Sequence, residues 1–221
     1  MKKNTEFTIK RFLIDVITDV VVVFLLVQVI RLYIFAPFRV HGPSMCNTFN
    51  IYNDECYNGD GEYILVSKFS VISLFGWRPG EINRGDILVF QAPGLTEGEY
   101  YIKRVIGEPG DKIKIANGFV YLMDAQGDYQ KLDEDYLNED NLGKTYTYRT
   151  IEQEYEVPDD KYFLLGDNRN KSSDSRRCFN QLGCNTESSP YLDFDYIQGE
   201  VKIVVFPLTH IRWISNPDYS I

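Results

Sequence analysis

The chain passes from an apolar N-terminal segment into a longer, more polar remainder through Phe38-Arg39-Val40-His41-Gly42-Pro43-Ser44-Met45-Cys46-Asn47-Thr48. An extended conformation over residues 38–44 would place Val40, Gly42 and Ser44 on the same side of the strand. The glycine two residues before Ser44 lets another chain come close to the backbone there. This pattern favours an exposed serine nucleophile beside a substrate groove, and the alternative is an ordinary serine in a Gly/Pro turn.

Upstream of this stretch, Val16–Phe35 is apolar and contains the unbroken run Val20–Val27. At the helical rise of 1.5 Å per residue, about 20 residues cross a hydrocarbon core of about 30 Å. We therefore predict a transmembrane helix over residues 13–36. An amphipathic helix lying on a membrane surface is the alternative, but the few polar residues are too scattered to form a polar face.

Basic residues precede the predicted span, and they are Lys2, Lys3, Lys10 and Arg11. The positive-inside rule keeps residues 1–12 in the cytoplasm and places residues 37–221 outside it. The apolar run is not followed by a small-residue cleavage site, which predicts that the span is retained as an anchor in the cell membrane.

The chain of 221 residues carries a formal net charge of −9, and the acidic excess lies in residues 37–221. Binding to phosphate groups needs the opposite sign of charge. The sequence therefore predicts no nucleic-acid partner.

Four cysteines form two locally spaced pairs, Cys46 with Cys56 and Cys178 with Cys184. Neither spacing is typical of a zinc site. An even number of cysteines outside the cytoplasm favours disulfides. We expect bridges 46–56 and 178–184, while the two other connectivities and four free buried thiols remain alternatives.

Short runs rich in β-branched and aromatic residues recur after Ser44 and predict strands. They lie at residues 62–68, 87–90, 100–106, 112–115, 119–122, 145–150, 152–157, 162–165 and 201–206. Asn117-Gly118 is typical of a β-hairpin turn. Because no long helical period follows the anchor, the sequence predicts a mostly β body of many short strands.

A serine nucleophile needs a base, and the sequence favours Lys103 for that role. His41 should point away from Ser44, and His210 lies near the end of the chain, so a Ser-His-Asp triad is not favoured. Lys103 lies within Tyr100–Ile106, whose aromatic and branched side chains would remove water from its amine. Lost hydration lowers a lysine pKa from about 10.4 toward about 7–8. The alternative is a lysine whose amine reaches solvent.

Residues 166–176 read Gly-Asp-Asn-Arg-Asn-Lys-Ser-Ser-Asp-Ser-Arg, a stretch too polar for a core. Gly166 permits a sharp turn, and Asp174 and Arg176 could pair. A serine of this stretch could hydrogen-bond to a neutral lysine. A surface loop rich in Asn and Asp is the alternative.

Taken in order, these stretches and one more resemble the sequence boxes of bacterial type I signal peptidases. The boxes are Gly42-x-Ser44-Met45-x-x-Thr48, Arg84-Gly85-Asp86-Ile87-Leu88-Val89-Phe90, Tyr101–Asp111 and Gly166–Arg176. One box alone only suggests this family, whereas four boxes in this order after an uncleaved anchor are specific for it. The resemblance covers the anchor and residues from Phe38 to about Trp213.

The resemblance implies a membrane-bound serine endopeptidase with a coiled β-sheet body, an apolar surface on the membrane, and no metal or cofactor. Ser44 would attack the scissile carbonyl and Lys103 would be the general base. Ser172 would hydrogen-bond to the lysine amine. The other supporting residues implied are Gly166, Asn168, Asp174 and Arg176. The substrate contacts implied are Phe38, Val40, Ile102 and Phe49. Substrates would be secreted preproteins with small residues, mostly alanine, at the first and third positions before the cut.

Three departures from the family pattern concern the nucleophile. Asn47 and Phe49 stand where proline and leucine are usual, Gly42 offers no hydroxyl to an oxyanion hole, and the Cys46–Cys56 loop is an insertion. Three rival interpretations also remain. They are an anchored β-domain that binds proteins or glycans without catalysis, a self-cleaving Ser/Lys repressor-type protease, and a family member specialised for a few substrates.

Overall fold

The computed structural model describes residues 2–53, 55–73, 77, 79–92, 98–148, 150–186, 188–217 and 219, with side chains from Ile9 onward. The side chains of Lys2 and Lys3 therefore lie outside the described part. One long helix, α1 (Lys2–Tyr33), comes first. The strands are β1 (Phe35–His41), β2 (Ile51–Tyr52), β3 (Glu55–Cys56), β4 (Asp60–Ser67), β5 (Ile87–Phe90), β6 (Tyr101–Gly107), β7 (Lys112–Ala116), β8 (Phe119–Met123), β9 (Tyr129–Lys131), β10 (Glu152–Glu156), β11 (Lys161–Leu165), β12 (Leu192–Asp193), β13 (Ile197–Phe206) and β14 (Arg212–Trp213). Short 3-10 helices are η1 (Ser175–Arg177), η2 (Phe194–Tyr196) and η3 (Leu208–His210).

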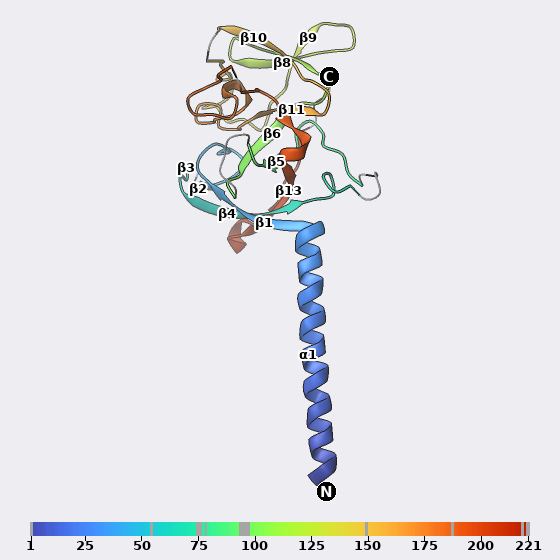
Figure 1. Cartoon of the computed structure of the whole chain (residues 1–221). Helices are drawn as coiled ribbons and strands as arrows, with labels where there is room; N and C mark the ends of the chain where they lie inside the picture. The colour runs from blue at the N-terminus through green and yellow to red at the C-terminus, as the bar shows by residue number, and fades with distance from the viewer. Residues whose placement is uncertain are drawn as a thin grey trace.

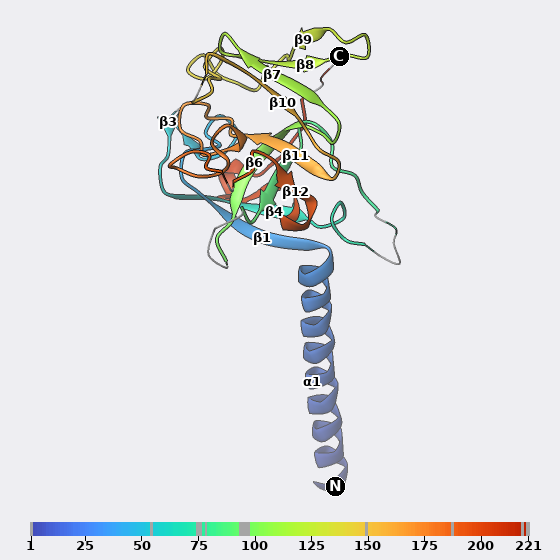
Figure 2. The ribbon, with the colours of Figure 1, turned by 45° about the horizontal axis from the view of Figure 1, so that its top comes forward.

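The described strands form one large antiparallel sheet and two smaller ones. The eight-stranded sheet has the order β1-β4-β13-β5-β6-β11-β12, with β14 on β13. A four-stranded sheet, β10-β7-β8-β9, lies at the end of the body far from α1, whereas β1 and β4 lie nearest to it (Figures 1 and 2). The predicted mostly β fold is confirmed.

The N-terminal helix is long and apolar enough to cross a membrane over Ile9–Tyr33, with a mean hydropathy of 2.5. Its large apolar side chains are exposed on all sides, so it has no polar face of the kind that an amphipathic surface helix needs. The helix begins before the predicted residue 13 and ends before the predicted residue 36. Lys68, directly after β4, holds the end of the helix: its N–H donates to the Ile34 carbonyl at 2.9 Å, and its Nζ donates to the Leu32 carbonyl at 3.1 Å.

Two local predictions are wrong. The extended segment predicted over residues 38–44 ends at His41, because Gly42 adopts a positive φ of 77° and starts a series of turns through Thr48. The edge strand predicted over residues 145–150 is reduced to a bridge between Thr145 and Gly118, with Arg149 outside the described residues. The Asn117-Gly118 hairpin is confirmed by φ values of 52° and 85°.

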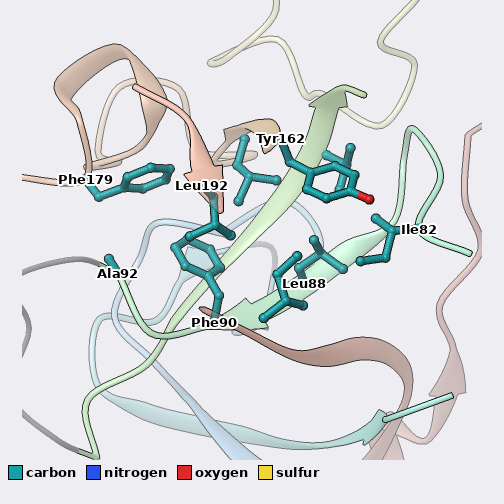
Figure 3. Close-up of a cluster of buried hydrophobic side chains, with 10 residues drawn as sticks. Ile82, Leu88, Phe90, Ala92, Tyr162, Phe179 and Leu192 are labelled. Carbon is teal, nitrogen blue, oxygen red and sulfur yellow. The ribbon is translucent and has the colours of Figure 1, made fainter. Parts of the chain in front are cut away.

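The core of the large sheet connects the strand that carries Lys103 with the last polar stretch. Phe90 on β5 packs edge-on against Phe179, the second residue after η1, with ring centroids 5.3 Å apart. Figure 3 shows both rings beside Leu192, within a buried cluster that also contains Leu88. This packing anchors the end of the 166–176 stretch to the sheet that carries the candidate site.

Candidate active site

Ser44 and Lys103 meet in the structure, although they are 59 positions apart in sequence. The Nζ of Lys103 lies 2.9 Å from the Oγ of Ser44 and donates to the carbonyl oxygen of Ile102 at 2.7 Å. Ser44 lies in the turn after β1, whereas Lys103 lies on β6. Only 3% of Lys103 is exposed, which rules out the alternative of a lysine reaching solvent.

The environment of Lys103 favours its neutral form. Burial lowers the pKa of its amine from 10.5 to about 8, and the carboxylates of Asp174 and Asp167 only partly oppose that shift. A lysine with a pKa near 8 is uncharged in a substantial fraction of molecules at neutral or slightly alkaline pH. The amine can therefore accept the proton of a neighbouring hydroxyl group.

The turn that carries Ser44 is held by the polar stretch 166–176. The backbone N–H of Asn168 donates to the Ser44 carbonyl at 3.1 Å. Gly166 packs so closely that an added Cβ would lie 2.2 Å from the Oγ of Ser172 and 2.6 Å from the Ser44 carbonyl oxygen. The absence of a side chain at position 166 thus sets how near the two segments lie.

A fully buried ion pair fixes the next part of the same stretch. Asp174 accepts from Arg176 Nε at 2.9 Å and from Nη2 at 2.8 Å, and it also accepts from the Gly166 N–H at 3.1 Å. Burial acts to raise the pKa of Asp174, but the charge and hydrogen bonds of Arg176 outweigh it and hold the pKa below 3.8. Asp174 is therefore ionised at neutral pH, as is typical of a structural carboxylate.

Ser172 lies at the site but does not make the predicted hydrogen bond to Lys103. Its Oγ is buried and has no hydrogen-bond partner of acceptable geometry among the described residues. Its hydroxyl instead lies beside Asp174 and contributes to the lowered pKa of that carboxyl group. The amine of Lys103 is satisfied by Ile102 and Ser44, which explains the difference.

A cleft of about 290 Å³ opens beside Ser44 and Lys103. Its other lining residues are Arg39, Val40, His41, Met45, Tyr100, Tyr101, Ile102, Lys171, Ser173 and Gln181. Of the four predicted substrate contacts, Val40 and Ile102 line it. Phe38 lies next to it, with its ring 5.2 Å from that of Tyr100.

The prediction that Phe49 contacts substrate is wrong. Its side chain is 0% exposed and belongs to the core cluster that contains Val66 and Val89. Asn47 lies nearer the surface and has a φ of 142°. Proline, with φ fixed near −65°, could not adopt that conformation. The departures at positions 47 and 49 therefore belong to the turn and the core.

Buried charged residues that the sequence analysis did not name as site residues also hold the turn that runs from Ser44 to Thr48. Arg104, next to Lys103 on β6, makes a bidentate ion pair with Asp167 at 2.9 and 2.7 Å. Its Nη2 also donates to Thr48 Oγ1 at 3.2 Å, and both charged residues are at most 2% exposed. The sequence signal for this ion pair was the presence of two adjacent basic residues, Lys103 and Arg104, in a largely apolar strand. That signal did not identify Asp167 as the partner of Arg104.

Comparison with known proteins places this site in a family. The sequence model described as "Signal peptidase, peptidase S26" matches residues 13–206, which include both Ser44 and Lys103. The chain belongs to the peptidase S26 family. It is 34% identical over 199 residues to signal peptidase I U of Bacillus subtilis strain 168, covering 89% of each chain. Signal peptidase I of Bacillus amyloliquefaciens is 33% identical and is matched over 98% of its length by 96% of this chain.

A solved signal peptidase I from Enterococcus faecalis V583 is a more distant match to this S26 peptidase. It aligns with 55% of this chain and 97% of that chain, with 25% identity and a TM-score of 0.37, an overlap that supports no conclusion about the fold. The family assignment rests on the sequence matches.

Both expected disulfides are present in this S26 peptidase. Cys46–Cys56 and Cys178–Cys184 have Cα–Cα distances of 5.6 and 5.0 Å. The first closes the inserted loop two residues after Ser44, and β2 and β3 pair within that loop. The second begins two residues after Arg176, so each bridge restrains a segment of the candidate site.

Gly166→Ala is expected to lower the kcat/KM of peptide cleavage by about 100-fold, the loss typical of a 1 Å misplacement at a catalytic centre. The new Cβ would have to push Ser44 or Ser172 away, since it would lie within 2.6 Å of both. Gly127→Ala, in the distant turn between β8 and β9, is the control, because a Cβ there meets open space although the φ of 91° makes alanine strained. A loss in Gly127→Ala as large as the loss in Gly166→Ala would show that reduced stability, and not the contact with Ser44, is responsible.

Proposed function

We propose that this chain is a membrane-bound serine endopeptidase that removes signal peptides from secreted preproteins after small residues of the Ala-x-Ala type. The observation that supports it most is the 2.9 Å contact between Ser44 Oγ and the buried amine of Lys103. The named relatives, which are signal peptidases I, support the same substrate class. The chemistry assigned to this chain's own groups needs no metal or cofactor.

In the first half of the reaction, neutral Lys103 takes the proton of Ser44 Oγ as that oxygen attacks the scissile carbonyl carbon. The Ser44 N–H would donate to the oxyanion that forms. Lys103 then returns the proton to the leaving amine as the C–N bond breaks. The products of this half are a free mature amino terminus and an ester between Ser44 and the signal peptide.

In the second half, Lys103 takes a proton from water, which attacks the ester. The bond to Ser44 breaks, the proton returns to Oγ, and the signal peptide leaves with a free carboxylate. Asp174 and Arg176 act by holding Gly166 and the 166–176 stretch in place, and Asn168 holds the Ser44 carbonyl. These are positioning roles.

Two open strand edges explain how a peptide would reach Ser44. β1 is the last strand of its sheet and pairs only with β4 among the described strands. Tyr101–Lys103 on β6 pairs with β5 on one side, while β11 begins its pairing only at Arg104 on the other. Both edges line the cleft, so an extended substrate can add as a strand between them. Val40, Met45 and Ile102 line the cleft and would favour small apolar side chains of the substrate.

We further propose that residues 13–36 anchor the chain, with residues 1–12 in the cytoplasm and 37–221 outside it as the peptidase domain. Exposed apolar side chains gather on β14, η3 and the end of β13, which lie on the side of the body where α1 attaches (Figure 1). They are Phe206, Leu208, Ile211 and Trp213. This surface would contact the bilayer and bring the cleft close to membrane-inserted signal peptides.

The test is incubation of the purified full chain, in detergent, with a preprotein that contains an Ala-x-Ala site. We expect cleavage after the second alanine, identified by the mass of both products, and its loss in Ser44→Ala. If the folded wild-type chain leaves the preprotein intact, or if Ser44→Ala cleaves normally, the proposal is wrong. An intact preprotein that binds to the chain would instead support the rival of a non-catalytic binding domain.

A further inference from the structure

A second pocket lies next to the catalytic cleft, on the side of the disulfide-closed loop, and the proposed reaction does not account for it. It has a volume of about 330 Å³. The disulfide Cys46–Cys56 forms one wall, and five asparagines, with Asp140 and Lys171, form the rest. The asparagines are Asn47, Asn138, Asn141, Asn168 and Asn170.

We propose that this asparagine pocket holds the substrate chain just after the cut, and that Lys171 selects an acidic side chain at its first or second residue. The proposal rests on the proposed function, since it names a further determinant of the same reaction. Its physical basis is the continuity of the two pockets.

Lys171 connects the two pockets because it lines both of them. Asn168 belongs to the second pocket, and its N–H holds the Ser44 carbonyl at 3.1 Å. Cys46, two residues after Ser44, lines the second pocket, whereas Met45 lines the first. If the residues before the cut lie between β1 and β6, a chain that continues past Ser44 enters the asparagine pocket beside Lys171.

The amide walls suit a peptide backbone and polar side chains. Asn141 is only 4% exposed and is fixed from both sides: its Nδ2 donates to Asn138 Oδ1 at 3.0 Å, and its Oδ1 accepts from Asn170 at 3.4 Å. Asn170 Nδ2 in turn donates to the Asp140 carbonyl at 2.8 Å. The wall is thus held in place by its own hydrogen bonds, and exposed amide groups at its rim can donate or accept.

Lys171 gives the pocket its charge preference. It is exposed and makes no ion pair with any residue that the structure describes. Three nearby carboxylates are already paired, since Asp167 pairs with Arg104, Asp174 with Arg176 and Glu134 with Arg169. Asp140 has no ion-pair partner among the described residues, but it lines only the second pocket, whereas Lys171 lines both. An incoming carboxylate at the junction of the two pockets beside Ser44 therefore meets the ammonium group of Lys171, whereas an incoming lysine meets a like charge.

The experiment uses the full chain in detergent and peptides that are identical up to an Ala-x-Ala cut, with Asp, Asn or Lys at the first or second residue after it. We expect kcat/KM to be higher for Asp than for Lys by roughly fivefold at one of these positions, the size expected when one surface attraction replaces one repulsion. The ratio should fall toward one in 1 M salt. Lys171→Gln should abolish the preference and Lys171→Glu should reverse it.

Lys112→Gln is the matched control, because Lys112 is an exposed lysine on β7 in the distant sheet and its loss changes the net charge equally. It should keep the wild-type ratio. Equal kcat/KM for the Asp and Lys peptides, or a preference that survives Lys171→Glu, would overturn the role of Lys171 while leaving the proposed function intact. Absence of cleavage of every peptide by the wild-type chain would instead refute the proposed function on which the inference depends.

Discussion

Replacing Lys103 by methionine is expected to lower kcat for preprotein cleavage by at least about 1,000-fold, within the range assigned to general-base catalysis. Methionine keeps much of the length of the side chain but cannot accept the Ser44 proton. Lys103→Arg should fail to a similar extent, although it retains a cation, because a guanidinium group stays protonated at any usable pH. The measurement is single-turnover cleavage of a preprotein by variants shown to fold by circular dichroism.

Lys112→Met, the same change at an exposed lysine at the start of β7, should cleave at the wild-type rate. A Lys103→Arg variant with near wild-type kcat would contradict the account, because it would mean that the residue supplies charge and not a proton acceptor. The comparison thus separates the two roles that a buried lysine can have.

Asp167→Ala is expected to lower the free energy of unfolding by about 3–5 kcal/mol, since it leaves the charge of Arg104 buried without its partner. Asp167 is 0% exposed and Arg104 is 2% exposed. Arg104 would still donate to the Gly85 carbonyl at 2.9 Å, which satisfies one donor but does not balance the charge. The measurement is urea denaturation at pH 7 in a fixed detergent, followed by tryptophan fluorescence.

Asp60→Ala is the control, because Asp60 pairs with Arg39 at the surface, where both side chains are largely exposed. Exposed pairs of this kind contribute little to the free energy of unfolding. If Asp167→Ala lowers the free energy of unfolding no more than Asp60→Ala does, the buried Arg104–Asp167 pair does not stabilise the fold as proposed.

The parts of the fold that the sequence predicted depend on local patterns. The anchor follows from the number of consecutive apolar residues, and the Asn117-Gly118 hairpin follows from two residues that tolerate positive φ. The β5 strand was recognisable because Ile87–Phe90 is buried on both faces and reads as a continuous apolar run. Both disulfides join cysteines close in sequence, where few other partners competed.

The errors arose where distant segments decide the outcome. Residues 145–150 have the composition of a strand, yet only Thr145 finds a partner in Gly118. The family resemblance implied a substrate contact for Phe49, whereas the turn after Gly42 directs its side chain into the core. The Arg104–Asp167 pair joins residues 63 positions apart, and neither local propensity nor hydrophobic periodicity contains that information.

The residues that line the cleft also show that local sequence patterns do not predict contacts between distant segments. The family resemblance implied substrate contacts for Val40 and Ile102, and both line the cleft. Lys171, Ser173 and Gln181 line it as well, but they come from the segment after β11, whose path depends on the packing of Phe179 against Phe90. A sequence gives no direct signal for such a contact between a loop and a sheet.

The central claim, that a neutral amine at position 103 activates Ser44, is tested most directly by the pH dependence of kcat/KM, which reports ionisations of the free enzyme. Because burial lowers the pKa of Lys103 to about 8, the deprotonated, active form accumulates above that pH. The account therefore predicts that kcat/KM rises through an apparent pKa near 8 and then levels off. A rise governed by a group near 10.5, the ordinary value for lysine, would contradict it, as would a rate independent of pH between 6 and about 10.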